Sequence, residues 1–488
     1  MNYKLVKASV TLMLAGLFGF GLLNMSACDP CHSCGGGPTP THTHRPTPTP
    51  TPAANACLPS SSIGVLVQTT NVTAYVPQGN WEGGNDAIAV VPIETSGGIG
   101  AGGSPTTVVT GNVPNSCSAN SNTGTTVCVA NNTDVYLING STLTSTLTSG
   151  ATNSESFSGG GCENCGVVVD SSTNRALITV GLNTIGTDRN PPVTDLGGPG
   201  GYQYLDLGGT PAFETPIGAG TDVSEDVTID PARQLILSPN EDSNYQIVNV
   251  SGSTPAIFNN ALTDPIGSGE LDSAAEDCTT GIAIATDEET GQLYLADLTQ
   301  ASFTAGTPGT WSSPGSQFEE FPEFDSLNAG TCGAAVAPGT HLAIVTGEFG
   351  GNLEGVVELP STSGSGTPTA VDYVAFTMPD EPDDVGPFNM GHDPHTVTSY
   401  VSPNNHNAYA VLGDGYFRYL GIVDMQGLLS APRTPVTPPA ISHTVAEPIS
   451  NNAACTGAGA PFSCCTGVGT GTGCLVTYIA EPTPTPTP

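Results

Sequence analysis

The sequence predicts an all-β protein whose repeated units close into a seven-bladed β-propeller, and three observations support this prediction. Residues 221–250 contain three short β runs separated by turn residues, at Val227 to Ile229, Leu235 to Leu237 and Ile247 to Val250. Similar units recur along the chain at a spacing of roughly 50 to 60 residues, which is long for a blade but within reach if loops are extended. The chain is also rich in Gly (62) and Pro (42), and no window shows the periodicity of an amphipathic helix.

Six further units resemble residues 221–250, four of them closely and two, the first along the chain, more faintly. They begin at Glu163, Glu276, Thr331 and His392, and at Ile63 and Ser116. No single unit could bury a core alone, so we expect them to close radially into a ring. Because the first two units are faint, six or eight blades are the alternatives to seven. Residues 442–445 are expected to return to the first blade and close the ring.

The segments that flank the repeats, residues 57–447, differ from them in composition. Residues 1–27 have a charged start with Lys4 and Lys7, a short apolar run and a small-residue end, which is typical of a secretory signal. Residues 28–56 are rich in Cys and Gly and then in Pro and Thr, so we expect an extended stalk. Residues 448–488 form a Cys- and Gly-rich tail that ends in Pro-Thr repeats, and we expect the Pro/Thr-rich termini to be disordered.

Two motifs overlap at the end of the signal. Met25-Ser26-Ala27-Cys28 resembles the lipobox of bacterial lipoproteins, which predicts cleavage before Cys28 and a lipid anchor on it. Met stands at the first position where Leu is usual, and this leaves ordinary secretion as the alternative. Cys28-Asp29-Pro30-Cys31-His32 also matches the attachment pattern of c-type haem. Cys28 cannot carry both groups, and the stalk that follows has no apolar residues to shield a porphyrin.

Charge and cysteine content narrow the class of partner. The chain has 8 basic and 44 acidic residues and a net charge of −36, which argues against nucleic acid as a partner and favours attraction of cations.

Export makes disulfides the expected state of the cysteines. Cys117 and Cys128 are spaced as if they flank a hairpin, and four cysteines near the end could close a small knot. The candidates are Cys117, Cys128, Cys162, Cys165, Cys278, Cys332, Cys455, Cys464, Cys465 and Cys474.

Polar pairs precede the first β run of four units, and they predict a cation site. The first strand of a blade lines the central channel, so these pairs are expected to converge at one mouth of it. Oxygen ligands in a ring suit calcium, and an imidazole would admit a transition metal. The alternative is that an acid at such a position bonds the backbone of a turn. The predicted ligands are Glu163, Asn164, Glu225, Asp226, Glu276, Asp277, His392 and Asp393.

His392 and His395 are the candidate catalytic residues, because either could act as a general base near a channel cation. For His395 the alternative is a residue packed between blades. No lysine follows Lys7, which excludes Schiff-base chemistry in the mature chain. The sequence also lacks a G-x-S-x-G motif and a phosphate-binding loop.

The last unit resembles the bacterial propellers of the YVTN and LVIVD-repeat kind. The resemblance is carried by Pro394-His395, Ser402 to Asn405, Ala408 to Val411 and Ile422 to Asp424. It implies a propeller with a binding or surface role and says little about activity. The predicted ring is also similar to that of calcium-dependent propeller lactonases. That comparison gives the cation to Glu163, Asn164, Glu225, Asp226 and Asp277.

The sequence thus favours an exported, lipid-anchored propeller that acts as a binding or structural protein at the cell envelope. It leans away from an enzyme. The expected partners are an envelope or surface protein, a glycan, or further copies of the chain, with a divalent cation, calcium first, in the channel. The alternatives are a metal-dependent hydrolase of lactones or esters, and an electron carrier with haem on Cys28, Cys31 and His32.

Overall fold

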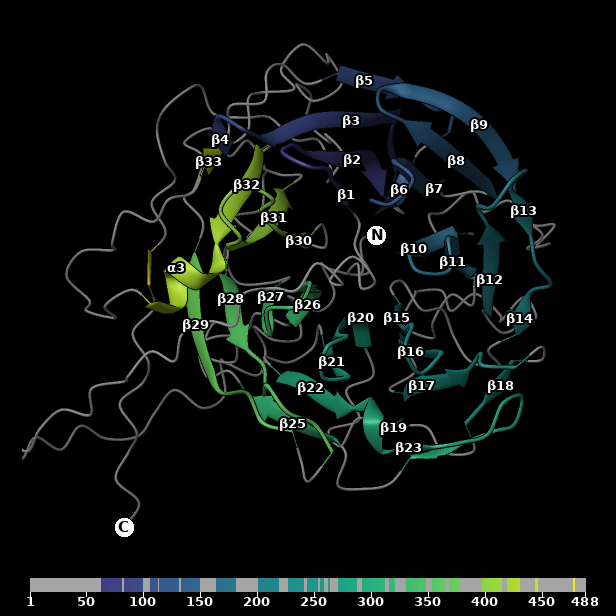
Figure 1. Cartoon of the computed structure of the whole chain (residues 1–488), viewed down its shortest axis with the longest axis vertical. Helices are drawn as coiled ribbons and strands as arrows, with labels where there is room; N and C mark the ends of the chain where they lie inside the picture. Colours follow the sequence, from purple (N-terminus) through teal and green to yellow (C-terminus); the bar gives the residue numbers. More distant parts are fainter. Residues whose placement is uncertain are drawn as a thin grey trace, which may run out of the picture. The chain divides into compact units, whose positions relative to one another are not determined.

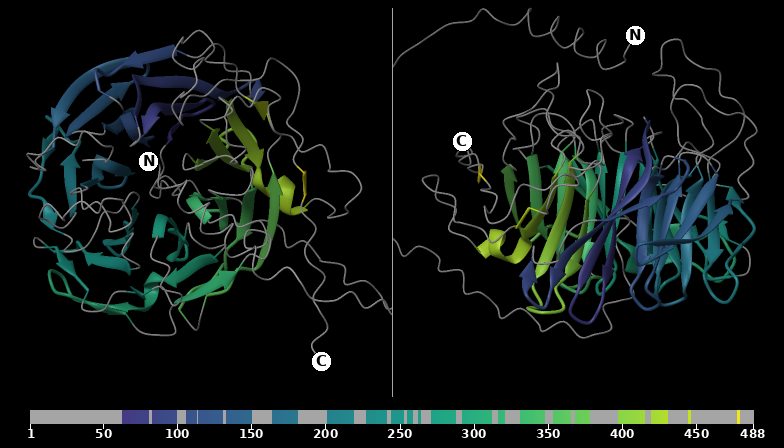
Figure 2. Two further views of the ribbon diagram at one scale, coloured as in Figure 1. Left: turned by 180° about the vertical axis from the view of Figure 1, so that it is seen from behind. Right: turned by 90° about the horizontal axis from the view of Figure 1, so that it is seen from above.

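Seven antiparallel sheets of four or five strands stand in a ring, so the prediction of a seven-bladed β-propeller is confirmed (Figure 1, Figure 2). The first strand of each blade lies nearest the centre. The computed structural model describes residues 63–80, 83–99, 106–112, 114–130, 133–149, 164–180, 201–218, 227–240, 244–252, 255–258, 262–263, 271–287, 292–311, 316–320, 331–347, 353–364, 368–377, 397–414, 419–430, 444–445 and 477–478. The predicted signal and stalk lie outside these residues.

Each of the first four blades contains consecutive strands that run outward from the channel, and in blades 1, 3 and 4 the last two strands both pair with the third. Blade 1 contains β1 (Gly64–Val67), β2 (Val72–Asn80), β3 (Gly83–Thr95), β4 (Gly98–Ile99) and β5 (Thr106–Val109). Blade 2 contains β6 (Pro114–Asn120), β7 (Thr125–Ala130), β8 (Asp134–Asn139) and β9 (Thr142–Thr148). Blade 3 contains β10 (Asn164–Asp170), β11 (Arg175–Val180), β12 (Gly201–Asp206), β13 (Ala212–Phe213) and β14 (Ile217–Gly218). Blade 4 contains β15 (Thr228–Asp230), β16 (Leu235–Asn240), β17 (Asn244–Asn249), β18 (Ala256–Ile257) and β19 (Leu262–Thr263).

The last three blades follow the same plan with additions at the rim. Blade 5 contains β20 (Leu271–Asp277), β21 (Ile282–Asp287), β22 (Gln292–Asp297) and β25 (Ser316–Glu320), and the 3-10 helix η2 (Leu298–Gln300) and a hairpin of β23 (Ala301–Ser302) and β24 (Thr310–Trp311) precede β25. Blade 6 contains β26 (Thr331–Ala337), β27 (Leu342–Gly347), β28 (Leu353–Glu358), β29 (Asp372–Thr377) and β34 (Thr477–Tyr478). Blade 7 contains β30 (Val397–Val401), β31 (Ala408–Asp414), β32 (Tyr419–Asp424) and β33 (Thr444–Val445), with helix α3 (Met425–Ser430) after β32.

Two outcomes near the C-terminus differ from the expectation. β33 pairs with β32 through Gly421 and Val445, so residues 444–445 complete blade 7 and do not join the first blade. Pairing with a strand of the same blade closes a shorter loop and therefore costs less entropy. β34, from the segment expected to be a tail, pairs with β29 of blade 6 through Phe376 and Tyr478.

The core is divided among the seven seams between neighbouring blades. Each of seven clusters of buried apolar side chains draws its members from two adjacent blades, including the seam between blades 7 and 1. A blade therefore buries both of its faces, which is why strands such as β27 are buried along their whole length and carry consecutive apolar residues, here Leu342 to Val345, without alternation. No blade has a core of its own, as expected for a repeat architecture.

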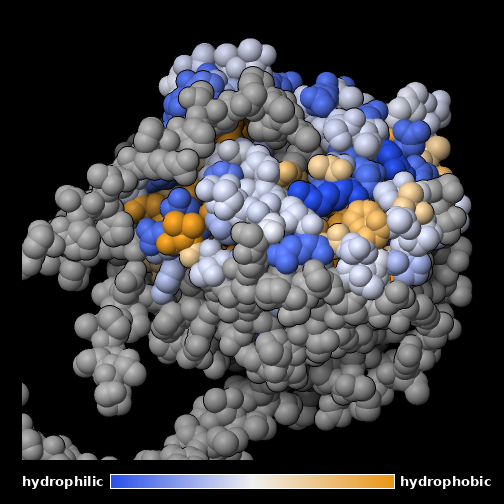
Figure 3. Space-filling view, turned by 60° about the horizontal axis from the view of Figure 1, so that its bottom comes forward, coloured by the Kyte–Doolittle hydropathy of each residue, from blue (hydrophilic) through white to orange (hydrophobic). Residues whose placement is uncertain are grey.

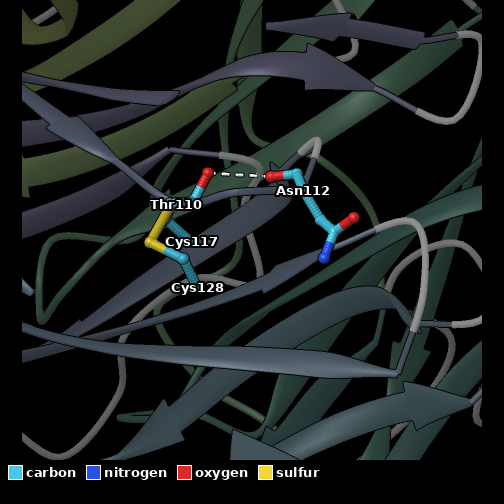
Figure 4. Close-up of a disulfide and its surroundings, with 4 residues drawn as sticks. All are labelled: Thr110, Asn112, Cys117 and Cys128. Carbon is cyan, nitrogen blue, oxygen red and sulfur yellow. Dashed lines mark hydrogen bonds between the residues drawn. A yellow bond between two sulfur atoms is a disulfide. The ribbon is translucent and has the colours of Figure 1, made fainter. Parts of the chain in front are cut away.

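One predicted disulfide is present inside this core. Cys117 and Cys128 are register partners on β6 and β7, with an S–S distance of 2.05 Å and no exposed surface (Figure 4). In the nearby turn before β6, the Thr110 hydroxyl donates to the carbonyl oxygen of Asn112 at 2.8 Å. Cys278, in the turn after β20, is also disulfide-bonded. For the other candidate cysteines, either the residue or its side chain lies outside the described part of the chain.

Candidate functional site

The turns that follow the first strands share one design. In blades 2 to 6 the turn ends in a left-handed residue, which is Gly124, Asn174, Gln234, Gly281 or His341. In blades 2, 3, 4, 5 and 7 the residue that opens the turn has a buried side chain whose oxygen accepts a backbone N–H of the same turn. These capping residues are Asn120, Asp170, Asp230, Asp277 and Ser402.

The last residue of the third strand caps a second set of turns on the same face of the ring. Asp297 accepts the N–H of Thr299 at 2.9 Å and, across the seam, the N–H of Gly364 at 2.6 Å. The amide nitrogen of Asn249 donates across its seam to the carbonyl of Thr304 at 2.8 Å. Asp424, which ends the Val-Asp motif of the last repeat, caps helix α3 through the N–H of Gly427. Many of the acids in the repeats are therefore structural.

The structure separates the predicted metal ligands that it describes. Asn164 begins β10, whereas Glu276 and Asp277 end β20. The blade 5 counterpart of Asn164 is Leu271, because both pair with the far end of the second strand. Glu276 and Asp277 thus lie at the opposite end of a first strand from Asn164, and the expected convergence of these three residues is not found. The sequence predicts that the pair Glu276-Asp277 precedes the first strand of its blade, whereas this pair ends the strand and the next residue, Cys278, lies in a turn.

The remaining predicted site residues lie outside the described part of the chain, so the channel cation and the catalytic histidines stay predictions. These residues are Glu163, Glu225, Asp226, His392, Asp393, His395, Cys28, Cys31 and His32.

Glu276 marks the most unusual buried position among the described residues. Register equivalents in other blades are apolar, for example Val169, Ile229 and Val336, whereas Glu276 is only 5% exposed. Among the described residues, its Oε1 atom has no hydrogen-bond partner. Burial, together with the negative charge of Asp230 across the seam, raises the pKa of Glu276 well above its ordinary value. The carboxyl is therefore protonated over a range in which an exposed glutamate is ionised.

The positively charged Arg233 lies beside the carboxyls of Asp230 and Glu276. Its Nη1 atom donates to Oδ2 of Asp230 at 2.6 Å, and its backbone N–H donates to Oδ1 of the same residue. The guanidinium lies against the backbone of Gly281, where a Cβ atom would approach Nη1 within 2.6 Å. Gly281 also has a φ of 78°, so both the space and the turn require glycine there.

On the other side of blade 5, Asp277 pairs with His341 of blade 6. Oδ2 of Asp277 lies 2.5 Å from Nδ1 of His341. Burial of Asp277 opposes its ionisation, but hydrogen bonds from His341 and Thr279 outweigh burial and lower the pKa of Asp277. The bond to Asp277 raises the pKa of His341 against the opposing effect of burial, with a further contribution from the charge of Glu358.

We define the carboxyl cluster as Asp230, Arg233, Glu276, Asp277 and His341. It spans blades 4, 5 and 6. Arg233 and His341 were not predicted from the sequence. The signal that could have found them is their position in the first turn of their repeats. Among the described residues, no group of three or more His, Cys, Asp or Glu side chains is arranged to hold a metal ion. The carboxyls are 0 to 5% exposed, so they can hold a proton and join blades, whereas the side chains of Arg233 and His341 are partly exposed.

The described surface is polar. Val109 and Val371 are its exposed large hydrophobic residues. On the face shown in Figure 3, apolar residues form small separate patches among hydrophilic ones. No helix in the described ranges is long and apolar enough to cross a membrane.

No protein-family model matches the chain, and no curated protein matches it in sequence. Among solved structures, the chain is similar to one chain of a crystal structure of the mitotic checkpoint complex. The two share 10% identity with a TM-score of 0.44, over 80% of this chain and 96% of the other. This similarity carries no argument about function. The strand pairing and the seven seams define the class of protein, which is a seven-bladed β-propeller.

Proposed function

We propose that this propeller is exported, anchored by lipid on Cys28, and acts as a binding or structural protein at the cell envelope. The observation that carries the proposal is the buried disulfide between Cys117 and Cys128 in the core of blade 2. Disulfides persist in oxidising compartments and are rare in the reducing cytosol. The signal-like residues 1–27 and the Pro/Thr-rich residues 28–56 support the same location.

A binding or structural role is supported by what the described residues do. Their buried acids cap turns and join blades, and their exposed surface is polar with few apolar side chains. We further propose a calcium ion held by Glu163, Asn164, Glu225, Asp226, His392 and Asp393, because carboxylate and amide oxygens at the starts of first strands suit that ion.

The test is the intact mass and metal content of the protein purified from its native membranes. We expect acyl chains on Cys28, recovery in the membrane fraction, and release into the soluble fraction when Cys28 is changed to Ala. A mature chain without acyl groups would contradict the anchor, and a mass increment of haem would establish the haem alternative.

Stoichiometric calcium that is lost in a Glu225→Gln variant would support the channel site. An absence of metal would remove both this site and the hydrolase alternative.

A further inference from the structure

Strand β9 of blade 2 lies on the outer rim of the ring (Figure 1, Figure 2). It is the last strand of its sheet, and in the part of the chain that the structure describes no strand pairs with its outer edge. Exposure alternates along it. Thr142, Thr144, Thr146 and Thr148 are exposed, and Leu143, Ser145 and Leu147 are half-buried.

This edge lacks the side chains that commonly protect a sheet edge from other strands. Exposed edges often carry Lys or another charged residue, or Pro. β9 contains only Thr, Leu and Ser, although the chain as a whole has 44 acidic residues. An irregularity in register occurs opposite Leu137 and Ile138, near the start of the strand, and pairing with β8 is regular from Ser145 to Thr148.

The sequence of this edge is its own reverse. Residues 140–150 read Gly-Ser-Thr-Leu-Thr-Ser-Thr-Leu-Thr-Ser-Gly, with Ser145 at the centre. If two copies pair antiparallel about a twofold axis at Ser145, Thr144 faces the partner's Thr146 and Leu143 faces the partner's Leu147. Every position then meets a residue of the same or a closely similar kind.

The backbone has the phase that such a pairing needs. The N–H of Ser149 donates to the carbonyl of Thr133 at 2.8 Å, so Ser149 faces β8. Because hydrogen-bonding direction alternates along the regular part of the strand, Ser145 and Leu147 also face β8, and the N–H and C=O groups of Thr146 and Thr148 point outward. Thr144 is the extra residue at the irregularity, and its hydroxyl donates to the carbonyl of Leu137 at 2.9 Å. A twofold axis at Ser145 therefore passes through a non-hydrogen-bonded pair, and the outward groups of Thr146 face Thr144 of the partner copy on both sides of the axis.

We propose that a second copy of this chain docks on β9 by antiparallel strand pairing centred on Ser145. The two blades then form one continuous sheet across an isologous twofold interface. The proposal does not rest on export or on lipid anchoring.

The expected dimer is weak in solution. A single pair of seven-residue strands buries less than the ~1,200 Å² of a typical stable interface. Two copies with a net charge of −36 each also repel one another, so added salt should tighten the dimer by screening. If the chain is also membrane-anchored, confinement to a surface raises the effective concentration of β9 edges.

The experiment is sedimentation equilibrium of the full mature chain with Cys28→Ala, over a wide range of protein concentration at low and high NaCl. We expect a reversible monomer–dimer equilibrium that tightens with salt. In Thr144→Lys/Thr146→Lys, lysines face each other across the axis, and we expect dimerisation to weaken at least about tenfold. In Thr144→Glu/Thr146→Lys, each glutamate faces a lysine, and we expect dimerisation to recover.

The control Ser361→Lys/Thr362→Lys makes the same charge change at exposed residues of blade 6 and should not weaken the dimer. Circular dichroism and the melting temperature establish that each variant is folded. Monomer at all concentrations in high salt overturns the proposal. So does a dimer that persists in Thr144→Lys/Thr146→Lys, because it would use another surface. Failure of Thr144→Glu/Thr146→Lys to recover overturns the register centred on Ser145.

Discussion

The buried carboxyl of Glu276 gives a prediction at the scale of one residue. Its pKa is raised in the folded state, so the folded protein keeps this proton to a higher pH than the unfolded chain does. Stability from this residue is therefore lost as pH rises above about 4.3, at about 1.4 kcal/mol per pH unit until the folded-state pKa is reached. Glu276→Gln has no proton to lose, so urea unfolding should show it more stable than wild type at pH 8 and nearly equal at pH 4. The exposed Asp86→Asn is the control. Equal pH dependence of Glu276→Gln and wild type would contradict the argument.

The pair of Asp277 and His341 makes the free energy of unfolding depend on pH in the opposite direction at low pH. The lowered pKa of Asp277 gives stability above about pH 4 that is lost as pH falls, and the raised pKa of His341 gives stability below about pH 6.5 that is lost as pH rises. The pair therefore contributes most between these values. His341→Asn keeps a residue that tolerates positive φ, as Asn174 does in blade 3. We expect it to cost about 1 to 2 kcal/mol near pH 5.5 and less at pH 9. A loss that does not vary with pH would mean that packing alone is responsible.

At the scale of the element, the residue that ends each third strand controls the turn after it. Asp297 is 1% exposed and accepts from Thr299, Gln300 and Gly364, the last across the seam. Asp297→Ala leaves several donors unsatisfied and should cost about 2 to 4 kcal/mol. The matched control is Asp206→Ala at the same position of blade 3. Asp206 is exposed and makes one bond, to the N–H of Gly208, so about 0.5 kcal/mol or less is expected. Thermal unfolding of both variants measures the two losses of stability, and equal losses would contradict the prediction.

The sequence was sufficient for the fold class because turn residues and apolar runs are local features. It misaligned blade 5 because the first strand there, residues 271–277, carries Ser273 where blades 3 and 6 have Gly166 and Gly333. The backbone at these three positions bonds a threonine hydroxyl 13 residues later, at Thr179, Thr286 and Thr346. That spacing would have given the correct alignment. The carboxyl cluster could not be predicted, since Asp277 and His341 are 64 residues apart and meet only after two blades pack.

At the scale of the whole molecule, the seam between blades 7 and 1 differs from the other six because no chain connection crosses it. Asn404 of blade 7 donates across this seam to Glu94 at 2.7 Å and to the carbonyls of Thr70 and Thr95. Asn122 of blade 2 makes a single bond across its seam, to the carbonyl of Ser171 at 3.0 Å. Both are exposed turn asparagines, so they form a matched pair.

Loosening a seam that the chain crosses leaves the two blades tethered, whereas loosening the closing seam lets the ring open, with hundreds of residues between its edges. We therefore expect Asn404→Ala to lower hydrogen-exchange protection in both β2 and β31 and to cost about 1 to 3 kcal/mol. Asn122→Ala should affect only the turns of blades 2 and 3, at a cost of about 1 kcal/mol or less. If Asn404→Ala changed exchange only in its own turn, the seven seams would be equivalent, and closure would depend on the apolar cluster of Ile63, Tyr400 and their neighbours rather than on these hydrogen bonds.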